Sequence, residues 1–200
     1  PLATFVGRRP LPVRHGLTMG ELARLFNGEH LAGRVPLRVV AMEGWRRGMH
    51  WRDTGLPWVA PSPNMPTPAT AAVYPGTGLL EGTNVSEGRG TCQPFEVLGA
   101  PWVDGRLADH LRGLARGGQL LGVCFRETGF VPTFSKYRGE QCLGVQVHVS
   151  DPSLFDPLRV ALAVLTALRR LYGPQLRWEP RGWIDKLAGT ARLREGVDAG

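Results

Sequence analysis

The segment from Glu81 to Thr91 carries a mixture of polar side chains that no regular helix or strand requires, and three glycines interrupt it. Gly82, Gly88 and Gly90 allow the backbone to adopt positive φ angles and allow a ligand to come close. The segment also carries two carboxylates, an amide, three hydroxyl groups and a guanidinium group. Apolar residues flank the segment on both sides and can anchor it in a core. The pattern favours a polar loop on a rigid scaffold, where functional residues are often found.

A cluster of Gly, Ser and Asn between apolar runs is also typical of an ordinary turn. Glu81 and Glu87 lie close in the sequence, but a catalytic pair of carboxylates is defined by its separation in space. The residues alone therefore leave a ligand site and a structural turn as alternatives.

The composition is that of a globular chain with many loops. Of the 200 residues, 42% are hydrophobic and 20% charged, while 27 glycines and 17 prolines are spread along the sequence. The net charge of +7 suits an anionic partner. Because the arginines are dispersed and no nucleic-acid motif is present, we expect no nucleic-acid partner. An acidic wall polymer fits the sign of the charge better.

The three cysteines, Cys92, Cys124 and Cys142, have no metal-ligand spacing, so no metal site is predicted. No apolar run approaches the ~20 residues that a membrane-spanning helix needs. The chain opens at Pro1 without an initiator Met, and we expect that an upstream segment has been removed.

Helix and strand signals alternate without a regular βαβ repeat. Helices are predicted from Thr18 to Asn27, from Thr67 to Gly76, from Asp104 to Gly117, from Asp156 to Gly173, and as two short helices after residue 182. Strands are predicted at residues 37–42, 121–126 and 143–150. The pattern indicates an α/β (mixed α+β) fold: a single compact domain with a mixed sheet packed by helices.

Four segments carry a resemblance to a known family: residues 12–23, 55–67, 81–91 and 132–136. Together, and in this order, they resemble the C-terminal domain of the NamZ-like exo-β-N-acetylmuramidases. The resemblance covers essentially the whole chain and assigns residues 1–200 to that domain.

The resemblance implies hydrolysis of a terminal β-linked N-acetylmuramic acid from the non-reducing end of peptidoglycan fragments, without a metal or an organic cofactor. It also implies a cell-envelope or secreted setting. Family members pair this domain with a Rossmann-like N-terminal domain, and the active site lies in the cleft between the two. The N-terminal domain is expected to have no counterpart here, and the isolated chain is expected to be inactive.

For the intact enzyme, Glu87 and Glu81 are the candidate catalytic carboxylates, although Glu81 is rather expected to neutralise Arg89. The candidate substrate-binding residues are Asn84, Ser86, Arg89, Arg14, His15, Asn64, Phe134 and Lys136. Cys92-Gln93 stands where the family resemblance leads us to expect Thr-Arg, and Leu143 where a Gly is more usual. Without an arginine at position 93, three cations remain as candidates to bind the substrate's lactyl carboxylate: Arg89, Arg14 and Lys136.

Two other functions are compatible with the residues. A non-catalytic wall-binding module would use Trp45, Trp51, Trp58 and Phe134 as stacking surfaces. A nucleotide-dependent enzyme would use the glycine-rich segment to hold phosphates, but Glu81 and Glu87 would repel an anion there.

Overall fold

The computed structural model describes residues 3–4 and 6–200, and the chain divides into two compact units. Unit 2 is Leu11–Trp58, and unit 1 consists of Val59–Gly200 together with the N-terminal residues as far as Pro10. The sequence had predicted one compact domain, so this division is a correction.

Unit 1 is built on a three-stranded sheet of strands β1 (Val97–Ala100), β2 (Val123–Phe130) and β3 (Cys142–Val149), in the order β1-β3-β2. Both pairings are antiparallel, which corrects the prediction of a mixed sheet. Two of the strands were predicted, with ends that shift by up to four residues, whereas the four-residue strand β1 was not. The mixed α/β class is confirmed.

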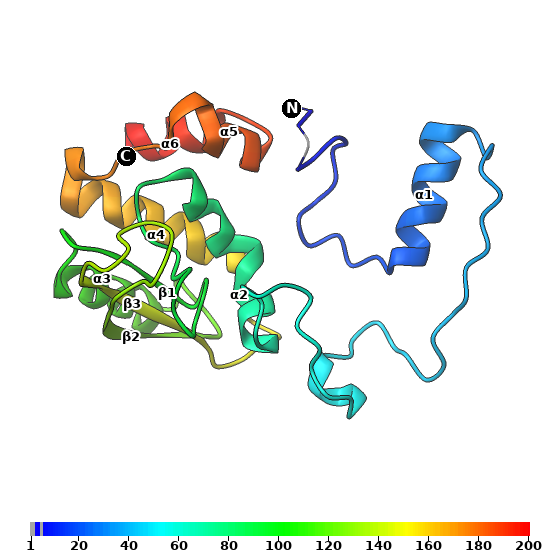
Figure 1. Ribbon diagram of the computed structural model, residues 1–200, viewed down its shortest axis with the longest axis horizontal. Coiled ribbons are helices and arrows are strands. Elements are labelled where there is room, and N and C mark those ends of the chain that lie inside the picture. The colour runs from blue at the N-terminus through cyan, green and yellow to red at the C-terminus, as the bar shows by residue number, and fades with distance from the viewer. Residues whose placement is uncertain (1–2, 5) are drawn as a thin grey trace. The chain divides into compact units, whose positions relative to one another are not determined.

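Two helices pack against this sheet, and a third helix packs on both of them (Figure 1). Helices α2 (Pro68–Thr77) and α3 (Gly105–Arg116) contact the strands, and α4 (Pro157–Tyr172) packs on both helices. Each begins at the residue predicted as its cap: Thr67, Asp104 and Asp156 accept backbone hydrogen bonds through their side chains. Val145 and Val147 from β3 meet leucines of α3 and α4 in one continuous core.

The remaining elements of unit 1 are short. The 3-10 helix η2 (Gly78–Gly82) continues α2, and η3 (Gly173–Gln175) continues α4. The 3-10 helix η4 (Pro180–Gly182) precedes α5 (Trp183–Ala188), which is followed by α6 (Arg192–Ala199). The two short terminal helices confirm the prediction for this part of the chain.

Unit 2 contains helix α1 (Met19–Leu31) and the 3-10 helix η1 (Trp51–Thr54). Thr18 and Glu21 form the predicted capping box. The predicted end at Asn27 is wrong: the helix continues to Leu31, because Ala32 adopts the left-handed conformation with φ 52° and donates its N–H to the carbonyl of Asn27.

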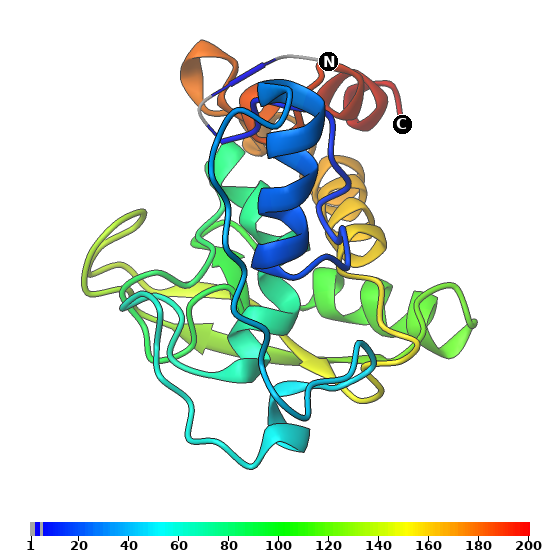
Figure 2. The ribbon, with the colours of Figure 1, turned by 90° about the vertical axis from the view of Figure 1, so that its right-hand side faces the viewer.

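The strand predicted at residues 37–42 is absent from unit 2, where these residues form no regular element and pair with no other strand. Figure 2 shows the helix followed by a long irregular segment. No side chain from Leu11 to Trp58 is fully buried. Residues 37–42 have the side chains of a strand but no partner strand, and an isolated strand is not stable in water.

Among the described residues, no helix combines the length and apolar character required to cross a membrane.

Candidate functional site

The polar segment identified in the sequence runs along the edge of the sheet. The backbone of Ser86 exchanges two hydrogen bonds with Gly99 of β1, at 2.8 and 3.0 Å. Gly88 and Gly90 have positive φ angles of 77° and 84°, as predicted. Gly82 does not: it is the last residue of η2, and its backbone is not left-handed. A side chain at Gly90 would place its Cβ 2.6 Å from the carbonyl oxygen of Phe134, so only glycine fits there. Residues 83–91 are thereby fixed by backbone contacts on both sides.

Four charged side chains of this region form one ionic network. Nη2 of Arg89 lies 2.6 Å from Oε1 of Glu81, and Nε of Arg89 lies 3.3 Å from Oε1 of Glu87. Nζ of Lys136 lies 3.0 Å from Oε2 of Glu87. The side chain of Glu87 is only 3% exposed, compared with 29% for Arg89 and 22% for Glu81. Arg89 and Glu81 thus form the accessible edge of the network, and Glu87 its buried centre.

Lys136 is surrounded by acceptors. Besides Glu87, its ammonium group donates to the carbonyl oxygens of Leu80, Glu81 and Val85 at 3.2, 3.4 and 3.1 Å. The four acceptors occupy the three N–H donors of the ammonium group, so no N–H is left over to bind a ligand. In this structure Lys136 therefore ties the loop of residues 131–141 to the polar segment.

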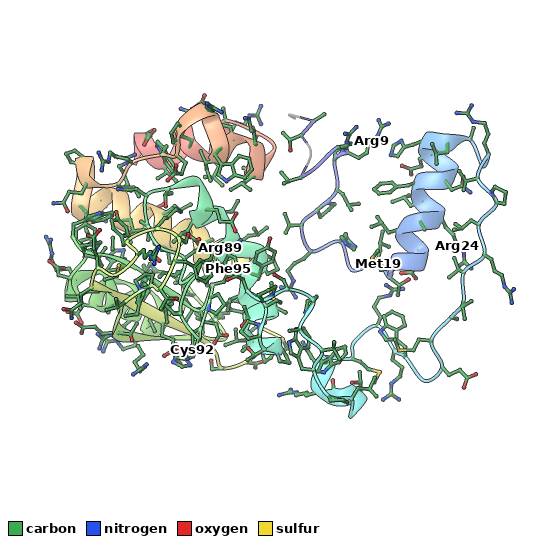
Figure 3. All side chains as sticks on the ribbon, viewed as in Figure 1. Arg9, Met19, Arg24, Arg89, Cys92 and Phe95 are labelled. Carbon is green, nitrogen blue, oxygen red and sulfur yellow. The ribbon has the colours of Figure 1, made fainter. Side chains whose placement is uncertain are left out.

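Arg89 also packs on an aromatic ring. Its guanidinium carbon lies 4.9 Å from the centroid of the Phe95 ring, and Figure 3 shows the two side chains close together. Phe95 in turn makes an edge contact with Tyr74 of α2, with 4.7 Å between the ring centroids. The ring of Phe95 and the carboxylate of Glu81 thus hold the arginine side chain in one orientation.

Asn84 and Ser86 have structural partners. The side chain of Asn84 accepts from the backbone N–H of Arg177 at 2.8 Å and donates to the carbonyl of Gln175 at 2.9 Å. The hydroxyl of Ser86 accepts from the backbone N–H of Gly88 at 3.3 Å. Their predicted contacts with substrate are not tested by these interactions and stay predictions.

The other predicted site residues are more scattered. Phe134 is half exposed, and Asn64 is partly buried in the proline-rich segment of unit 1. Arg14 and His15 belong to unit 2, where Nδ1 of His15 accepts from the backbone N–H of Leu17 at 3.0 Å. Within unit 1, the structure therefore joins Glu81, Glu87, Arg89 and Lys136 into a network that includes neither Phe134 nor Asn64.

Glu96 is a candidate that the sequence analysis missed. It lies directly before β1 and is 9% exposed. Its Oε1 accepts from the hydroxyls of Thr70 at 2.6 Å and Thr67 at 3.2 Å. The sequence identified Thr67 only as a helix cap, and no local pattern connects it with a glutamate that lies 29 positions further along the chain.

Unit 1 also has a surface pocket of about 450 Å³. Trp102 and Tyr137 form its aromatic part, and the indole N–H donates to the tyrosine hydroxyl at 3.1 Å. The remaining lining residues are Pro101, Glu140, Pro174, Gln175 and Arg177. Aromatic rings beside polar groups are typical of sites that bind small molecules.

No group of three or more His, Cys, Asp or Glu side chains within residues 3–4 and 6–200 is arranged to hold a metal ion.

Comparison with known proteins identifies two matching family models. The model described as exo-beta-N-acetylmuramidase NamZ, C-terminal, matches residues 72–200, and the N-terminal model of the same family matches residues 1–69. The sequence analysis had assigned all 200 residues to the C-terminal domain and expected no counterpart of the N-terminal one. That expectation is not confirmed, because residues 1–69 resemble part of the N-terminal domain.

Individual relatives agree with the family models. The chain is 46% identical over 199 residues to the peptidoglycan beta-N-acetylmuramidase NamZ of Bacillus subtilis, covering 99% of this chain and 47% of that protein. A crystal structure of a DUF1343 family protein from Bacteroides fragilis matches with a TM-score of 0.85 and 33% identity, over 96% of this chain and 51% of the other. A second DUF1343 structure from this organism matches with a TM-score of 0.71 and 26% identity, over 98% of this chain and 51% of the other. The chain spans about half the length of these relatives.

Proposed function

Since this chain belongs to the exo-beta-N-acetylmuramidase NamZ family, we propose that it forms part of a peptidoglycan-degrading glycoside hydrolase. The proposed substrate is a wall fragment with a terminal β-linked N-acetylmuramic acid at its non-reducing end. The observation that carries the proposal is the family match over residues 72–200, the part of the chain that contains the ionic network. No cofactor is required by this reaction, since acid and base groups of the protein suffice.

Arg89 is the best placed cation for the lactyl carboxylate of the substrate. Its guanidinium group is partly exposed and is oriented by Glu81 and Phe95. A guanidinium group can form two parallel charge-assisted hydrogen bonds with a carboxylate. Lys136 has less capacity for this role because protein oxygens occupy its donors.

Glu87 is proposed to act mainly by holding Arg89 and Lys136. Both of its oxygens are in ion pairs, and its side chain is almost completely buried. A catalytic role for Glu87 or Glu81, predicted from the sequence, remains open to direct test by the Glu87→Gln and Glu81→Gln variants. Loss of a carboxylate that reacts with substrate would lower kcat, whereas loss of an orienting group would mainly raise KM.

The domain boundary is proposed to lie at the start of α2 (Pro68–Thr77), close to the point where the two family models meet. Residues 1–69 would then complete an N-terminal domain whose larger part is supplied by further sequence in a protein of the relatives' length. The absence of any fully buried side chain in residues 11–58 supports this, because an independently stable domain buries a core.

The experiment uses a full-length protein that contains this chain and two chromogenic substrates, a β-N-acetylmuramide and the matching β-N-acetylglucosaminide. We expect release of the chromophore from the muramide and little from the glucosaminide. In the Arg89→Ala variant we expect a KM for the muramide that is about 10-fold to 100-fold higher, from loss of one charge-assisted contact. Arg138→Ala, at an exposed position, is the matched control. Equal turnover of both sugars by the wild type would contradict the proposal.

A second candidate function, a non-catalytic wall-binding module, is favoured by the pocket beside Trp102 and Tyr137. It predicts that the 200-residue chain binds soluble muropeptides by calorimetry and that Trp102→Ala abolishes the binding. If the full-length protein is active but the 200-residue chain binds no muropeptide, only the hydrolase function is supported.

A further inference from the structure

The structure contains two buried carboxylates whose environments differ, Glu87 and Glu96. Glu87 has two cationic partners, Arg89 and Lys136. Glu96 forms no ion pair with any residue in the described part of the chain, although the protein carries 24 lysines and arginines. A buried carboxyl group that binds no cation keeps an oxygen free to exchange a proton with a ligand.

The contacts of Glu96 distinguish its two oxygens. Thr70 donates to Oε1 at 2.6 Å, and the hydroxyl of Thr67 lies 3.2 Å from the same oxygen. The two threonine hydroxyls are themselves 3.0 Å apart. Both threonine hydroxyls thus hold Oε1, and Oε2 is the oxygen left to exchange a proton with a ligand.

Oε2 of Glu96 is accessible. This oxygen accepts no hydrogen bond from the described residues. It is nevertheless not a buried atom without a partner, because Nε of Arg169 is the only such side-chain nitrogen or oxygen in the described part of the chain. Oε2 therefore has contact with solvent, next to the exposed residue Thr67. A substrate oxygen could approach it from that side while Oε1 stays fixed.

We propose that Glu96 is the general acid of the glycosidase, a role that rests on the proposed function above. Its carboxyl group donates the proton on Oε2 to the glycosidic oxygen while the bond between that oxygen and the anomeric carbon breaks. The leaving sugar departs as an alcohol, and a water molecule adds its oxygen to the anomeric carbon and releases one proton. Solvent returns a proton to Glu96, so that the net reaction consumes one water.

Thr70 is the positioning residue for this acid. Its hydroxyl makes the shorter of the two contacts with Oε1, and Thr67 and Thr70 both lie at the start of α2, on a rigid element. Removal of this hydroxyl should let the carboxyl group rotate and exchange the roles of its oxygens. The effect should appear in kcat rather than in KM, because the buried Thr70 hydroxyl acts on the carboxyl group and not on the substrate.

The test measures how the rate depends on the leaving group. In the full-length protein, Glu96→Gln should lower kcat about 10²-fold to 10⁴-fold on a muramyl-N-acetylglucosamine disaccharide, whose leaving alcohol needs a proton. On a 2,4-dinitrophenyl muramide, whose leaving group departs without protonation, the loss should be less than about 10-fold. Thr70→Val should lower kcat on the disaccharide, and Thr70→Ser should restore it.

Two controls separate this role from a structural one. Glu43→Gln makes the same substitution at an exposed position of unit 2 and should leave both rates unchanged. Thermal unfolding of Glu96→Gln should match the wild type, since glutamine can keep the contacts with both threonines. Equal losses on the two substrates in a folded Glu96→Gln variant would overturn the role of Glu96 while the hydrolase stands. A wild type that releases muramic acid from neither substrate would overturn the proposed function itself.

Discussion

Nζ of Lys136 lies 3.0 Å from Oε2 of Glu87, and the two side chains are only 20% and 3% exposed. The pair connects the loop of residues 131–141 with the polar segment at the edge of the sheet. Because both groups are largely removed from water, either one would be left as a nearly buried charge if its partner were deleted.

The first prediction concerns this pair. Lys136→Met should destabilise unit 1 by about 3 kcal/mol, because Glu87 loses one of its two cations and three backbone carbonyls lose a donor. Chemical denaturation monitored by tryptophan fluorescence measures the change. Arg138→Met, at an exposed position two residues away, should change stability by less than about 0.5 kcal/mol. The double variant Lys136→Met/Glu87→Gln should lose less stability than the two single variants together. A loss equal to their sum would argue against coupling between the two residues.

The second prediction concerns the contact between α2 and α4. A Cβ on Gly76 would lie 1.8 Å from the carbonyl oxygen of Pro157, so Gly76→Ala must separate the two helices. We expect a loss of about 2 kcal/mol or more in the free energy of unfolding. Gly113→Ala in α3 is the control, because no atom lies within 4 Å of its added Cβ. Alanine there should stabilise the helix by about 0.5–1 kcal/mol, and similar effects at both positions would contradict the packing described.

The third prediction concerns thiol reactivity. Burial, with a smaller effect of the Glu140 carboxylate, raises the pKa of Cys142 to about 11, whereas Cys92 and Cys124 are exposed. At pH 8 in the native state, iodoacetamide should modify Cys92 and Cys124 and spare Cys142, since the thiolate is the reactive form. Mass spectrometry of tryptic peptides identifies the modified sites. All three should react in denaturant, and rapid modification of Cys142 in the folded protein would show that β3 is accessible at that end.

The fourth prediction concerns the capping box of α1. The hydrogen bond from Arg47, followed by that from the backbone of Thr18, lowers the pKa of Glu21 from 4.5 to about 2. A lowered folded-state pKa means that the stabilisation is present above pH 4.5 and is lost as the pH falls through about 2. Carboxyl NMR titration should place Glu21 near the lower value. Arg47→Gln should shift the titration towards 4.5, and an unchanged titration in that variant would rule out Arg47 as the main cause.

Local signals accounted for most of the helices. Thr67, Asp104 and Asp156 cap α2, α3 and α4 as predicted, because a cap depends on residues within one turn of the helix start. Strand β1 was missed because Val97–Ala100 is short and is defined by its pairing with β3. Residues 37–42 show the reverse case: a β-rich composition without a partner strand forms no sheet.

The sequence by itself determined the family, the helix starts and the glycine-bent polar segment, because each depends on residue types at short spacing. Only the tertiary structure decided which partners each carboxylate has. Folding brings Lys136 to Glu87 and leaves Glu96 with two threonine hydroxyls, although both glutamates lie in the same short stretch of sequence. The partners come from residues 26 to 49 positions away, and electrostatic interactions depend on distance in space rather than on spacing along the chain.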